Sequence, residues 1–432
     1  MSTRVVIVGA GFAGIACARH LAADKDISVT LIDRNDYHQF QPLLYQVATS
    51  MLSPRDIIYP NRKIAAEYTD FTFKRGDVVA IDPVAKTATT DTGESYEGDY
   101  LVLAAGPQPN FFGTPGAEHA FPLYSLDDAN SLSTRIIQAF EEADRSEARL
   151  EDGAIHFVIV GGGPTGVEVA GALAEMINTT MTHEFPALAP KAKVTLVDHG
   201  HALLTMFADK GHDYAARVLQ KDDVELLFGT GVTEIGPGHV TLSDGSTIRT
   251  RCVIWGGGLK ASGIAATSGM PQGKGGRIDV NSDFTVTDFP GVLVIGDIAN
   301  IPAKEGSWHP QLGSVALQSG GAGARTIQAL IKGETPKHFS YLDKGTMAMI
   351  GRGAAVAQVA GVELHGKLAF TAWLGVHAAL MTGGSNRVEA FRSWAIDFFG
   401  KERAPEALDR SGSPRMQWDD DVAEPATAGA GG

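Results

Sequence analysis

The feature that most constrains this chain is a glycine-rich dinucleotide-binding signature that occurs twice. The first copy spans residues 4–14 and the second spans residues 155–166. In each copy a β-branched run ends in G-x-G-x-x-G, and a stretch of small residues with helical character follows. Each copy then continues into a second predicted strand that ends in an acid, Asp33 or Asp198. One copy would be a weak signal, whereas two complete copies predict two bound dinucleotides with electrons passing between them.

Three glycines in each copy are expected to have separate tasks. The first permits a sharp turn after the strand. The second lets the backbone approach a pyrophosphate because it has no Cβ, and the third lets the helix pack closely on the strand. These residues are Gly9, Gly11 and Gly14 in the first copy, and Gly161, Gly163 and Gly166 in the second. The free N–H groups of the following helix N-terminus favour an anion, so both turns are predicted phosphate sites.

The acid after each second strand indicates which nucleotide is preferred. Asp33 lies 19 residues after Gly14, near the spacing of a carboxylate that accepts from a ribose 2′-hydroxyl. Asp198 lies 32 residues after Gly166, and an insertion at 181–191 accounts for the longer spacing. A carboxylate here disfavours a 2′-phosphate, which predicts NADH over NADPH. An aspartate that only caps the strand end is the alternative for either position.

Other residues narrow the class of protein. Asp297 follows Gly296 at the end of a predicted strand, where open α/β folds hold ligands, and it could accept from a ribityl hydroxyl. The net charge of −14 argues against a nucleic-acid partner. Cys17 and Cys252 form no zinc or C-x-x-C pattern, so we expect two structural thiols, no metal site and a cytoplasmic redox setting.

Strands alternate with helices along most of the chain, which predicts an α/β fold with parallel sheets. We expect two Rossmann-like dinucleotide-binding domains, one inserted in the other, plus a small C-terminal region. The predicted boundaries are 1–112 with 275–335 for the first domain, 113–274 for the second with its linkers, 336–403 for the C-terminal region, and 404–432 for a disordered tail.

The sequence shows neither a signal peptide nor a membrane-spanning segment. Residues 5–8 lead straight into a glycine turn. The longest apolar candidate, 368–381, has 14 residues and includes His377, whereas a spanning helix needs about 20. Association with a membrane surface therefore stays open.

Several segments carry a resemblance to a known family: 37–49, 101–106, 161–171, 253–255, 293–297 and 341–352. Through them the chain resembles the two-dinucleotide-binding flavoprotein reductases, and most of all the type II NADH dehydrogenases. These are single-subunit NADH:quinone oxidoreductases that do not pump protons. The match covers residues 3–355 well and 356–403 loosely. It implies a glutathione-reductase-like FAD/NAD(P)-binding fold.

The resemblance implies FAD on the first signature and NADH on the second. The FAD contacts that it implies are Gly9, Gly11, Phe12, Ala13, Gly14, Asp33, Arg34, Val78, Ala105, Gly106, Asp297, Gly313 and Ser314. The NADH contacts that it implies are Gly161, Gly163, Pro164, Thr165, Gly166, Glu168, Asp198 and Gly257. The implied activity passes two electrons from NADH through FAD to a respiratory quinone, either menaquinone or ubiquinone.

Two residues are implied to act on the quinone. Glu168 matches an acid that lies between the nicotinamide and quinone sites of the family and takes part in quinone reduction. A carboxylate favoured by the helix dipole is the alternative. Gln318 matches the second glutamine of the family's quinone motif, whereas Ser314 replaces the first. Serine is shorter but still donates one hydrogen bond, so quinone affinity or headgroup preference is expected to differ.

The C-terminal region is implied to meet a membrane. Relatives use amphipathic helices there, and this chain offers two apolar sets: Leu368, Phe370, Trp373, Leu374, Val376 and Leu380, then Phe391, Trp394, Ile396, Phe398 and Phe399. Residues 340–403 carry seven Lys/Arg and five Asp/Glu, which favours anionic lipid. We expect a peripheral protein on the cytoplasmic face of the cell membrane, and a homodimer. An ordinary dimer interface or core helix is the alternative for these residues.

Two other functions fit the same scaffold. One is an NADH-dependent reductase of a small soluble redox protein such as a ferredoxin. The other is a low-turnover flavoprotein that senses NADH. The absence of a redox dithiol argues against disulfide reductases and sulfide:quinone oxidoreductases.

Overall fold

The computed structural model describes residues 2–359 and 361–399; the tail predicted to be disordered, 404–432, lies outside them. The chain forms two compact units. Of the described residues, unit 1 contains those up to 39, 58–110 and 259–343, and unit 2 contains 40–57, 111–258 and those from 344 to 399. The predicted α/β class with two nested dinucleotide-binding folds is confirmed.

Unit 1 is built on a six-stranded sheet in the order β21-β22-β9-β1-β2-β5. Its strands are β1 (Thr3–Val8), β2 (Ile27–Asp33), β5 (Phe71–Arg75), β9 (Tyr100–Leu103), β21 (Thr285–Val286) and β22 (Phe289–Val294). Strands β22, β9, β1, β2 and β5 are parallel. Their carboxyl ends therefore meet at one edge, where open α/β sheets bind ligands.

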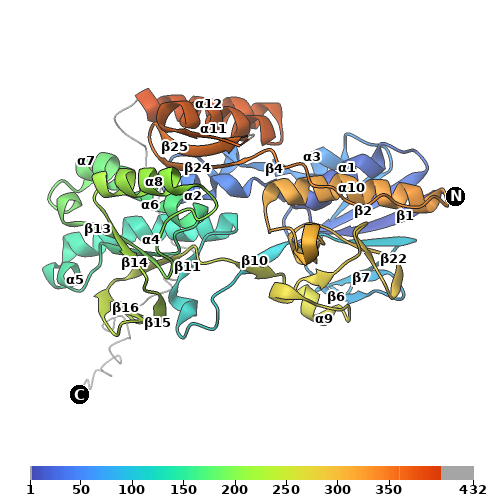
Figure 1. The fold of residues 1–432 in the computed structure, drawn as a ribbon, viewed down its shortest axis with the longest axis horizontal. Coiled ribbons are helices and arrows are strands. Elements are labelled where there is room, and N and C mark those ends of the chain that lie inside the picture. The colour runs from blue at the N-terminus through green and yellow to red at the C-terminus, as the bar shows by residue number, and fades with distance from the viewer. Residues whose placement is uncertain (1, 360, 400–432) are drawn as a thin grey trace, which may run out of the picture. The chain divides into compact units, whose positions relative to one another are not determined.

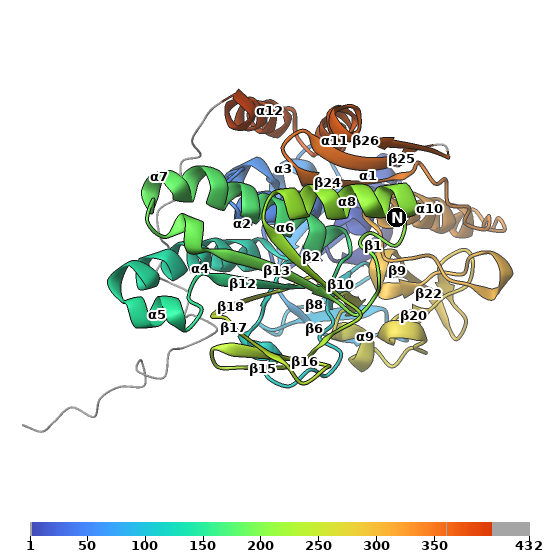
Figure 2. The same cartoon turned by 60° about the vertical axis from the view of Figure 1, so that its left-hand side comes forward.

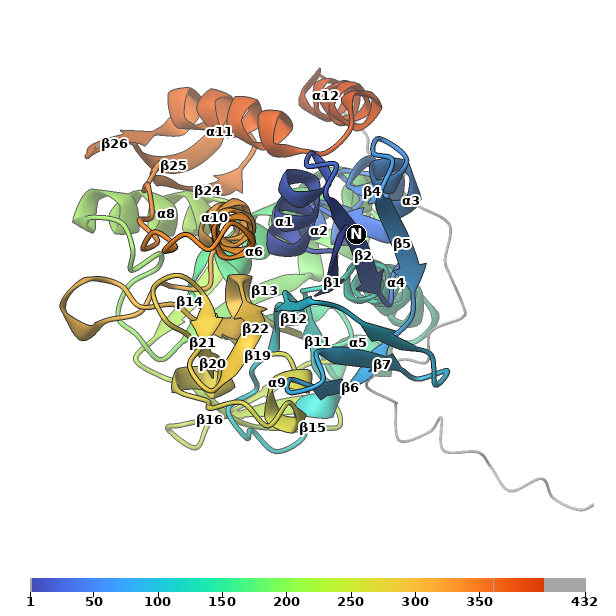
Figure 3. The ribbon, with the colours of Figure 1, turned by 90° about the vertical axis from the view of Figure 1, so that its right-hand side faces the viewer.

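Two helices of unit 1 pack against each other beside this sheet, α1 (Phe12–Ala22) and α10 (Gly313–Ile331) (Figure 1). Figure 3 shows α1 next to β1 and β2. Glycine makes the close helix contact possible, because a Cβ on Gly320 would lie 2.2 Å from the carbonyl oxygen of Ala13. The smaller elements of the unit are β3 (Tyr37–Gln39), β4 (Ile58–Pro60), α3 (Asn61–Ala65), β6 (Val78–Asp82), β7 (Thr87–Thr90), β8 (Ser95–Glu97) and α9 (Ile264–Thr267).

Unit 2 repeats the parallel sheet in the order β11-β18-β12-β13-β14. The strands are β11 (Phe121–Pro122), β12 (His156–Val160), β13 (Lys193–Asp198), β14 (Val224–Phe228) and β18 (Cys252–Trp255). Helices α6 (Pro164–Met176) and α8 (Asp209–Lys221) lie along β13 and β14 (Figure 2). A three-stranded antiparallel sheet is formed by β15 (Val232–Gly236), β16 (His239–Leu242) and β17 (Thr247–Arg249).

A long helix, α4 (Leu126–Arg145), precedes the second signature and packs on β11 and β18. The sequence predicts a helix around 132–149, which starts too late and ends too late. A capping box, in which Ser125 and Asp128 each accept from the other's backbone N–H, starts the helix six residues earlier. An extended Ser146 ends it, and α5 (Glu147–Glu151) follows.

The C-terminal region belongs to unit 2. A hairpin sheet of β24 (Thr346–Gly351), β25 (Ala354–Val359) and β26 (Val362–His365) is covered by α11 (Gly366–Leu380), and α12 (Gly384–Phe399) packs on α11 (Figure 2). The hairpin meets α6 closely, because a Cβ on Gly171 would lie 1.6 Å from the carbonyl oxygen of Ile350. Among the described residues, no helix is both long and apolar enough to span a bilayer.

The observed unit boundaries differ from the predicted ones at residues 40–57 and 259–274, and residues 336–343 of the predicted C-terminal region lie in unit 1. Residues 40–57 pack in unit 2, because α2 (Leu44–Ala48) lies against α4 and α6. Residues 259–274 pack in unit 1, because β19 (Leu259–Ala261) pairs with β10 (Pro107–Pro109). Pairing between distant segments decides both cases.

Candidate active site

The glycine turn of unit 1 leaves space for a phosphate group. Gly9 has a φ of +104°, and a Cβ there would lie 2.4 Å from the carbonyl oxygen of Ala104. A Cβ on Gly14 would lie 1.8 Å from the carbonyl oxygen of Gly9. A Cβ on Gly11, in contrast, would meet nothing within 4 Å. Gly11 is the N-cap of α1, and its lack of a side chain leaves room for a phosphate at the start of this helix.

The acid at the end of β2 is fastened to this turn. Asp33 accepts from the backbone N–H of Ala10 at 2.6 Å and from that of Asn35 at 2.8 Å. Burial raises the pKa of Asp33, and these two backbone N–H groups oppose the rise. His38 supports the same turn, because its Nδ1 donates to the carbonyl oxygen of Ala10 at 2.8 Å. Burial lowers the pKa of His38 to about 4, so its ring is neutral.

Asp297 offers an unused acceptor at the same edge of the sheet. Its Oδ1 is buried and has no hydrogen-bond partner among the described residues. Burial raises the pKa of Asp297 to about 7, and the charge of Arg277 acts in the opposite direction. A buried, unpaired carboxylate oxygen is costly unless a ligand hydroxyl supplies a hydrogen bond. Together with the space at Gly11, it fits the sugar chain and phosphates of a flavin nucleotide.

The first turns of α10 carry the two positions of the predicted quinone motif. Ser314 Oγ lies 2.8 Å from the hydroxyl oxygen of Tyr341. Gln318 Nε2 donates to the carbonyl oxygen of Leu342 at 2.9 Å, and Gln318 Oε1 accepts from the backbone N–H of Leu342 at 3.0 Å. Both side chains therefore fasten residues 341–342 to α10. One N–H of the Gln318 amide is left for another acceptor.

Unit 2 repeats the phosphate turn at β12 and α6. Gly161 has a φ of +110°. A Cβ on Gly166 would lie 1.8 Å from the carbonyl oxygen of Gly161. A Cβ on Gly163, the N-cap of α6, would meet nothing within 4 Å. Asp198 accepts from Gly162 at 2.5 Å and from Gly200 at 2.6 Å. The turn and the acid are thus one rigid assembly, as in unit 1.

Glu168 lies on α6, five residues after Gly163. Its Oε1 accepts from the backbone N–H of Met349 on β24 at 3.2 Å. Burial raises the pKa of Glu168 to about 8, and the opposing effects of the Met349 N–H and the Trp373 indole are smaller. The carboxyl group is therefore protonated at neutral pH. The Met349 N–H occupies Oε1 and leaves Oε2 to carry a proton, the arrangement that a general acid needs.

The side chains around Glu168 were missed in the sequence. Met349, Trp373, Gln46 and Trp394 come from four separate segments, and they are linked by hydrogen bonds and ring contacts. Trp373 and Trp394 are predicted from their pattern only as members of an apolar face. No local spacing could have shown that both rings face inward, because that depends on how α11 and α12 pack.

The predicted contacts gather at the carboxyl ends of strands in their own unit. The implied FAD contacts follow β1, β2, β5, β9 and β22 or begin α10, so all of them lie in unit 1. The implied NADH contacts follow β12, β13 and β18 or lie on α6, so all of them lie in unit 2. Their roles as ligand contacts stay predictions.

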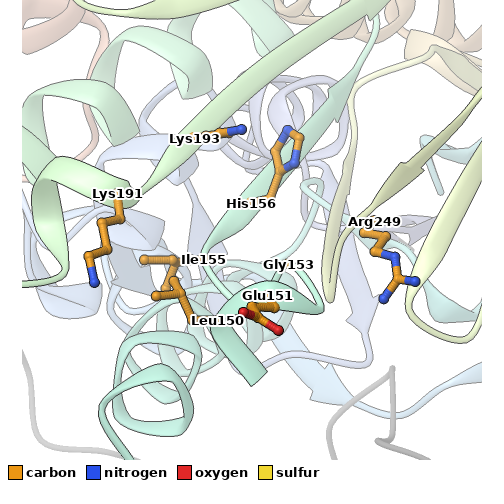
Figure 4. A pocket seen from close by; sticks show the side chains of 8 residues that line it. All are labelled: Leu150, Glu151, Gly153, Ile155, His156, Lys191, Lys193 and Arg249. Carbon is orange, nitrogen blue, oxygen red and sulfur yellow. The ribbon is translucent and has the colours of Figure 1, made fainter. Parts of the chain in front are cut away.

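A different cavity, of about 210 Å³, lies at the opposite edge of the sheet in unit 2. It is lined by Leu150, Glu151, Gly153, Ile155, His156, Lys191, Lys193 and Arg249 (Figure 4). His156 and Lys193 begin β12 and β13, whereas Gly161 and Asp198 stand at the other ends of these strands. The cavity is therefore separate from the nucleotide turn.

Two glycine turns, each with an acid at the next strand, define a reductase with two dinucleotide sites. Residues 3–320 match the family model described as pyridine nucleotide-disulphide oxidoreductase. The type II NADH:quinone oxidoreductase Ndh of Mycobacterium tuberculosis is 36% identical over 93% of this chain and 89% of its own length. The chain belongs to the type II NADH:quinone oxidoreductase family.

A further relative and a solved structure are also similar to this chain. The type II NADH:quinone oxidoreductase of Staphylococcus aureus is 29% identical over 85% of this chain and 92% of its own length. The structure of NDH2 from Plasmodium falciparum in complex with NADH has a TM-score of 0.88 and 18% identity. The match covers 94% of this chain and 100% of the Plasmodium falciparum chain. At this identity the likeness supports the fold.

Proposed function

We propose that the chain oxidises NADH and reduces a quinone, with two electrons carried through bound FAD and no proton pumping. The balanced reaction is NADH + H⁺ + quinone → NAD⁺ + quinol. The observation that carries the proposal is a second dinucleotide turn that leads straight into α6, whose Glu168 accepts from the backbone N–H of Met349 on β24. When bound, the flavin supplies the two-electron redox chemistry.

The residues of unit 1 hold the flavin nucleotide as FAD. The N–H groups at the start of α1 bind its pyrophosphate, Asp33 binds the ribose and Asp297 Oδ1 accepts from a ribityl hydroxyl. The residues of unit 2 hold NADH in the same way, through the start of α6 and Asp198. Glu168 delivers a proton to a quinone oxygen from Oε2 and regains one before the next turnover. The remaining N–H of Gln318 orients a quinone carbonyl.

The decisive experiment follows the two half-reactions of the purified yellow protein by stopped-flow absorbance. NADH is expected to reduce the flavin, and menaquinone or ubiquinone analogues are expected to reoxidise it quickly. Rapid reoxidation by a ferredoxin and not by either quinone would overturn the proposal. Reduction by NADH with no fast acceptor would favour the sensing alternative instead.

Asp198 sets the preference for NADH in this proposal. Replacing Asp198 by Ala removes a carboxylate that binds the ribose and repels a 2′-phosphate. A hydrogen bond to a charged group contributes about 1.5–3 kcal/mol, so the NADH/NADPH ratio of kcat/KM is expected to fall by about tenfold or more. Steady-state kinetics with both nucleotides measure this ratio. Asp244→Ala, which removes an exposed carboxylate that accepts from Ser246, is the control. An unchanged ratio in Asp198→Ala would remove the assigned role.

The C-terminal helices provide a surface for peripheral membrane binding on the cytoplasmic face. Large apolar side chains are exposed on α11 and α12: Leu368, Val376, Leu380, Val388, Phe391 and Ile396. An exposed apolar set beside lysines and arginines suits the interface of an anionic bilayer. A homodimer that covers the same face is the second possibility, and sedimentation without lipid distinguishes it.

A matched pair of valines tests the membrane proposal. Val388 on α12 is 66% exposed, and Val84, between β6 and β7 of unit 1, is 78% exposed. Val388→Glu is expected to weaken co-sedimentation with phosphatidylglycerol-containing vesicles by about tenfold, because it loses apolar burial and adds repulsion. Val84→Glu is expected to bind as the unmodified protein does. Equal binding of both variants would exclude this face as the contact.

A further inference from the structure

A buried hydrogen bond joins helix α12 to residues 40–57, which also belong to unit 2. The indole Nε1 of Trp394 donates to Gln46 Oε1 at 2.7 Å. Gln46 is 0% exposed and Trp394 is 5% exposed. A buried amide and a buried indole are both costly when unpaired, so this bond opposes any opening of α12 from residues 40–57.

The Gln46 side chain continues from this bond toward Glu168. Its Nε2 donates to the Tyr45 hydroxyl at 3.0 Å, and that hydroxyl lies 3.2 Å from Met349 Sδ. The backbone N–H of Met349 is the group that donates to Glu168 Oε1. Gln46 therefore contacts the strand residue that orients the acid.

The Trp394 ring continues toward Glu168 by a second route. It packs edge-to-face on Trp373, with the ring centroids 5.9 Å apart. Trp373 is 0% exposed and stacks on His377 at 3.9 Å. Trp373 lies beside Glu168, although its buried indole N–H forms no hydrogen bond with a described residue. Two routes thus lead from one enclosed hydrogen bond to the same carboxyl group.

We infer that Gln46 and Trp394 are positioning residues, which hold α12 and α11 closed over Glu168 so that its proton is retained until a quinone takes it. The inference rests on the proposed function, because it concerns the proton that Glu168 delivers. It also assigns the C-terminal helices a second task. Their exposed face meets the membrane, and their inner face holds the neighbours of the acid in place.

Charged neighbours do not explain the protonation of Glu168. On its own helix, Glu175 is paired with Arg352 at 2.7 Å. On α11, burial lowers the pKa of His377 to about 4, so that ring is neutral, and Lys367 is exposed. On α2 the titratable residue is Tyr45, and β24 has no titratable residue. On α12 the charged side chains of Arg387, Glu389 and Arg392 are exposed. Enclosure by Met349, Trp373 and the packing around them is left as the cause, and Gln46 and Trp394 maintain that enclosure.

Two single variants and one double variant test the inference in the flavin-loaded enzyme. Trp394→Phe removes the indole donor from Gln46 Oε1, and Gln46→Leu leaves the Trp394 indole N–H without its acceptor. Each change is expected to admit water and to lower the pKa of Glu168 by about one unit or more. The double variant removes both polar groups, which restores a dry contact and returns the pKa toward that of the unmodified enzyme. Glu389→Gln, an exposed change on the same helix, is the control.

The direct readout is an infrared titration of the protonated carboxyl band, identified by its loss in Glu168→Gln. The second readout is the pH profile of quinone reduction, which is expected to move in the same direction. If both single variants titrate as the unmodified enzyme does and lose only thermal stability, the bond is structural and the inference is wrong. The infrared readout does not depend on quinone turnover, so failure of the proposed function would be seen separately.

Discussion

Replacing Glu168 by Gln is expected to slow quinone reduction by about 10²–10³-fold, the usual contribution of a positioned general acid. Flavin reduction by NADH is expected to stay within about twofold of the unmodified enzyme, because no proton from Glu168 is needed there. Glutamine matches the neutral carboxyl in shape and can accept from Met349, but it cannot release a proton. Stopped-flow traces of the two half-reactions separate these effects. Equal slowing of both steps would contradict the proposed role, and Glu184→Gln, an exposed change on α7 (Thr182–Glu184), is the control.

The pH dependence follows from the direction of the pKa shift. The pKa of Glu168 is raised to about 8, so the donating form is present below this pH and disappears above it. Quinone reduction in the unmodified enzyme is therefore expected to be fast below pH 8 and to decline above it. Glu168→Gln is expected to lose this decline. A profile that is identical in both proteins would assign the titration to another group.

Replacing Gly14 by Ala is expected to abolish flavin retention and to lower the free energy of unfolding by about 3 kcal/mol or more. The new Cβ would lie 1.8 Å from the carbonyl oxygen of Gly9, so α1 has to move away from β1. This movement also displaces the N–H groups that face the pyrophosphate. Visible flavin absorbance per chain and denaturant unfolding measure the two effects.

Two other glycines provide the controls for this result. Gly11→Ala is expected to fold normally, because its Cβ meets no atom within 4 Å, but to bind flavin weakly, because it occupies the phosphate space. Gly166→Ala has the same 1.8 Å clash in unit 2, so it is expected to lose NADH binding while the protein stays yellow. Flavin retained fully in Gly14→Ala would contradict the assignment of the first turn.

The parts of the site that follow from local sequence were predictable. A glycine turn requires residues at fixed offsets, so Gly9, Gly11 and Gly14 could be assigned to separate tasks, and the geometry of the turn agrees. The long run of small residues at 313–331 is likewise a local signal for a helix, and α10 has these bounds. In both cases neighbours along the chain supply the physical cause.

The parts that depend on distant pairing were not predictable. Residues 40–57 follow the first signature in the chain, yet they pack on α4 and α6 of the other unit. The hydrogen bond between Gln46 and Trp394 joins residues 348 positions apart. Ser314 could be recognised as a departure from the family motif, but its partner Tyr341 could not be deduced. Tertiary contacts of this kind leave no periodic pattern in a single sequence.

The absence of a side chain at residue 171 has a consequence for engineering. Backbone of α6 and backbone of β24 touch there, so the nucleotide domain and the C-terminal hairpin cannot be treated as exchangeable modules. Chimeras that import residues 344–399 from another homologue should tolerate many surface differences. A chimera should fail to fold when the residue of α6 at position 171 is alanine or larger, because its Cβ would clash with the backbone of β24.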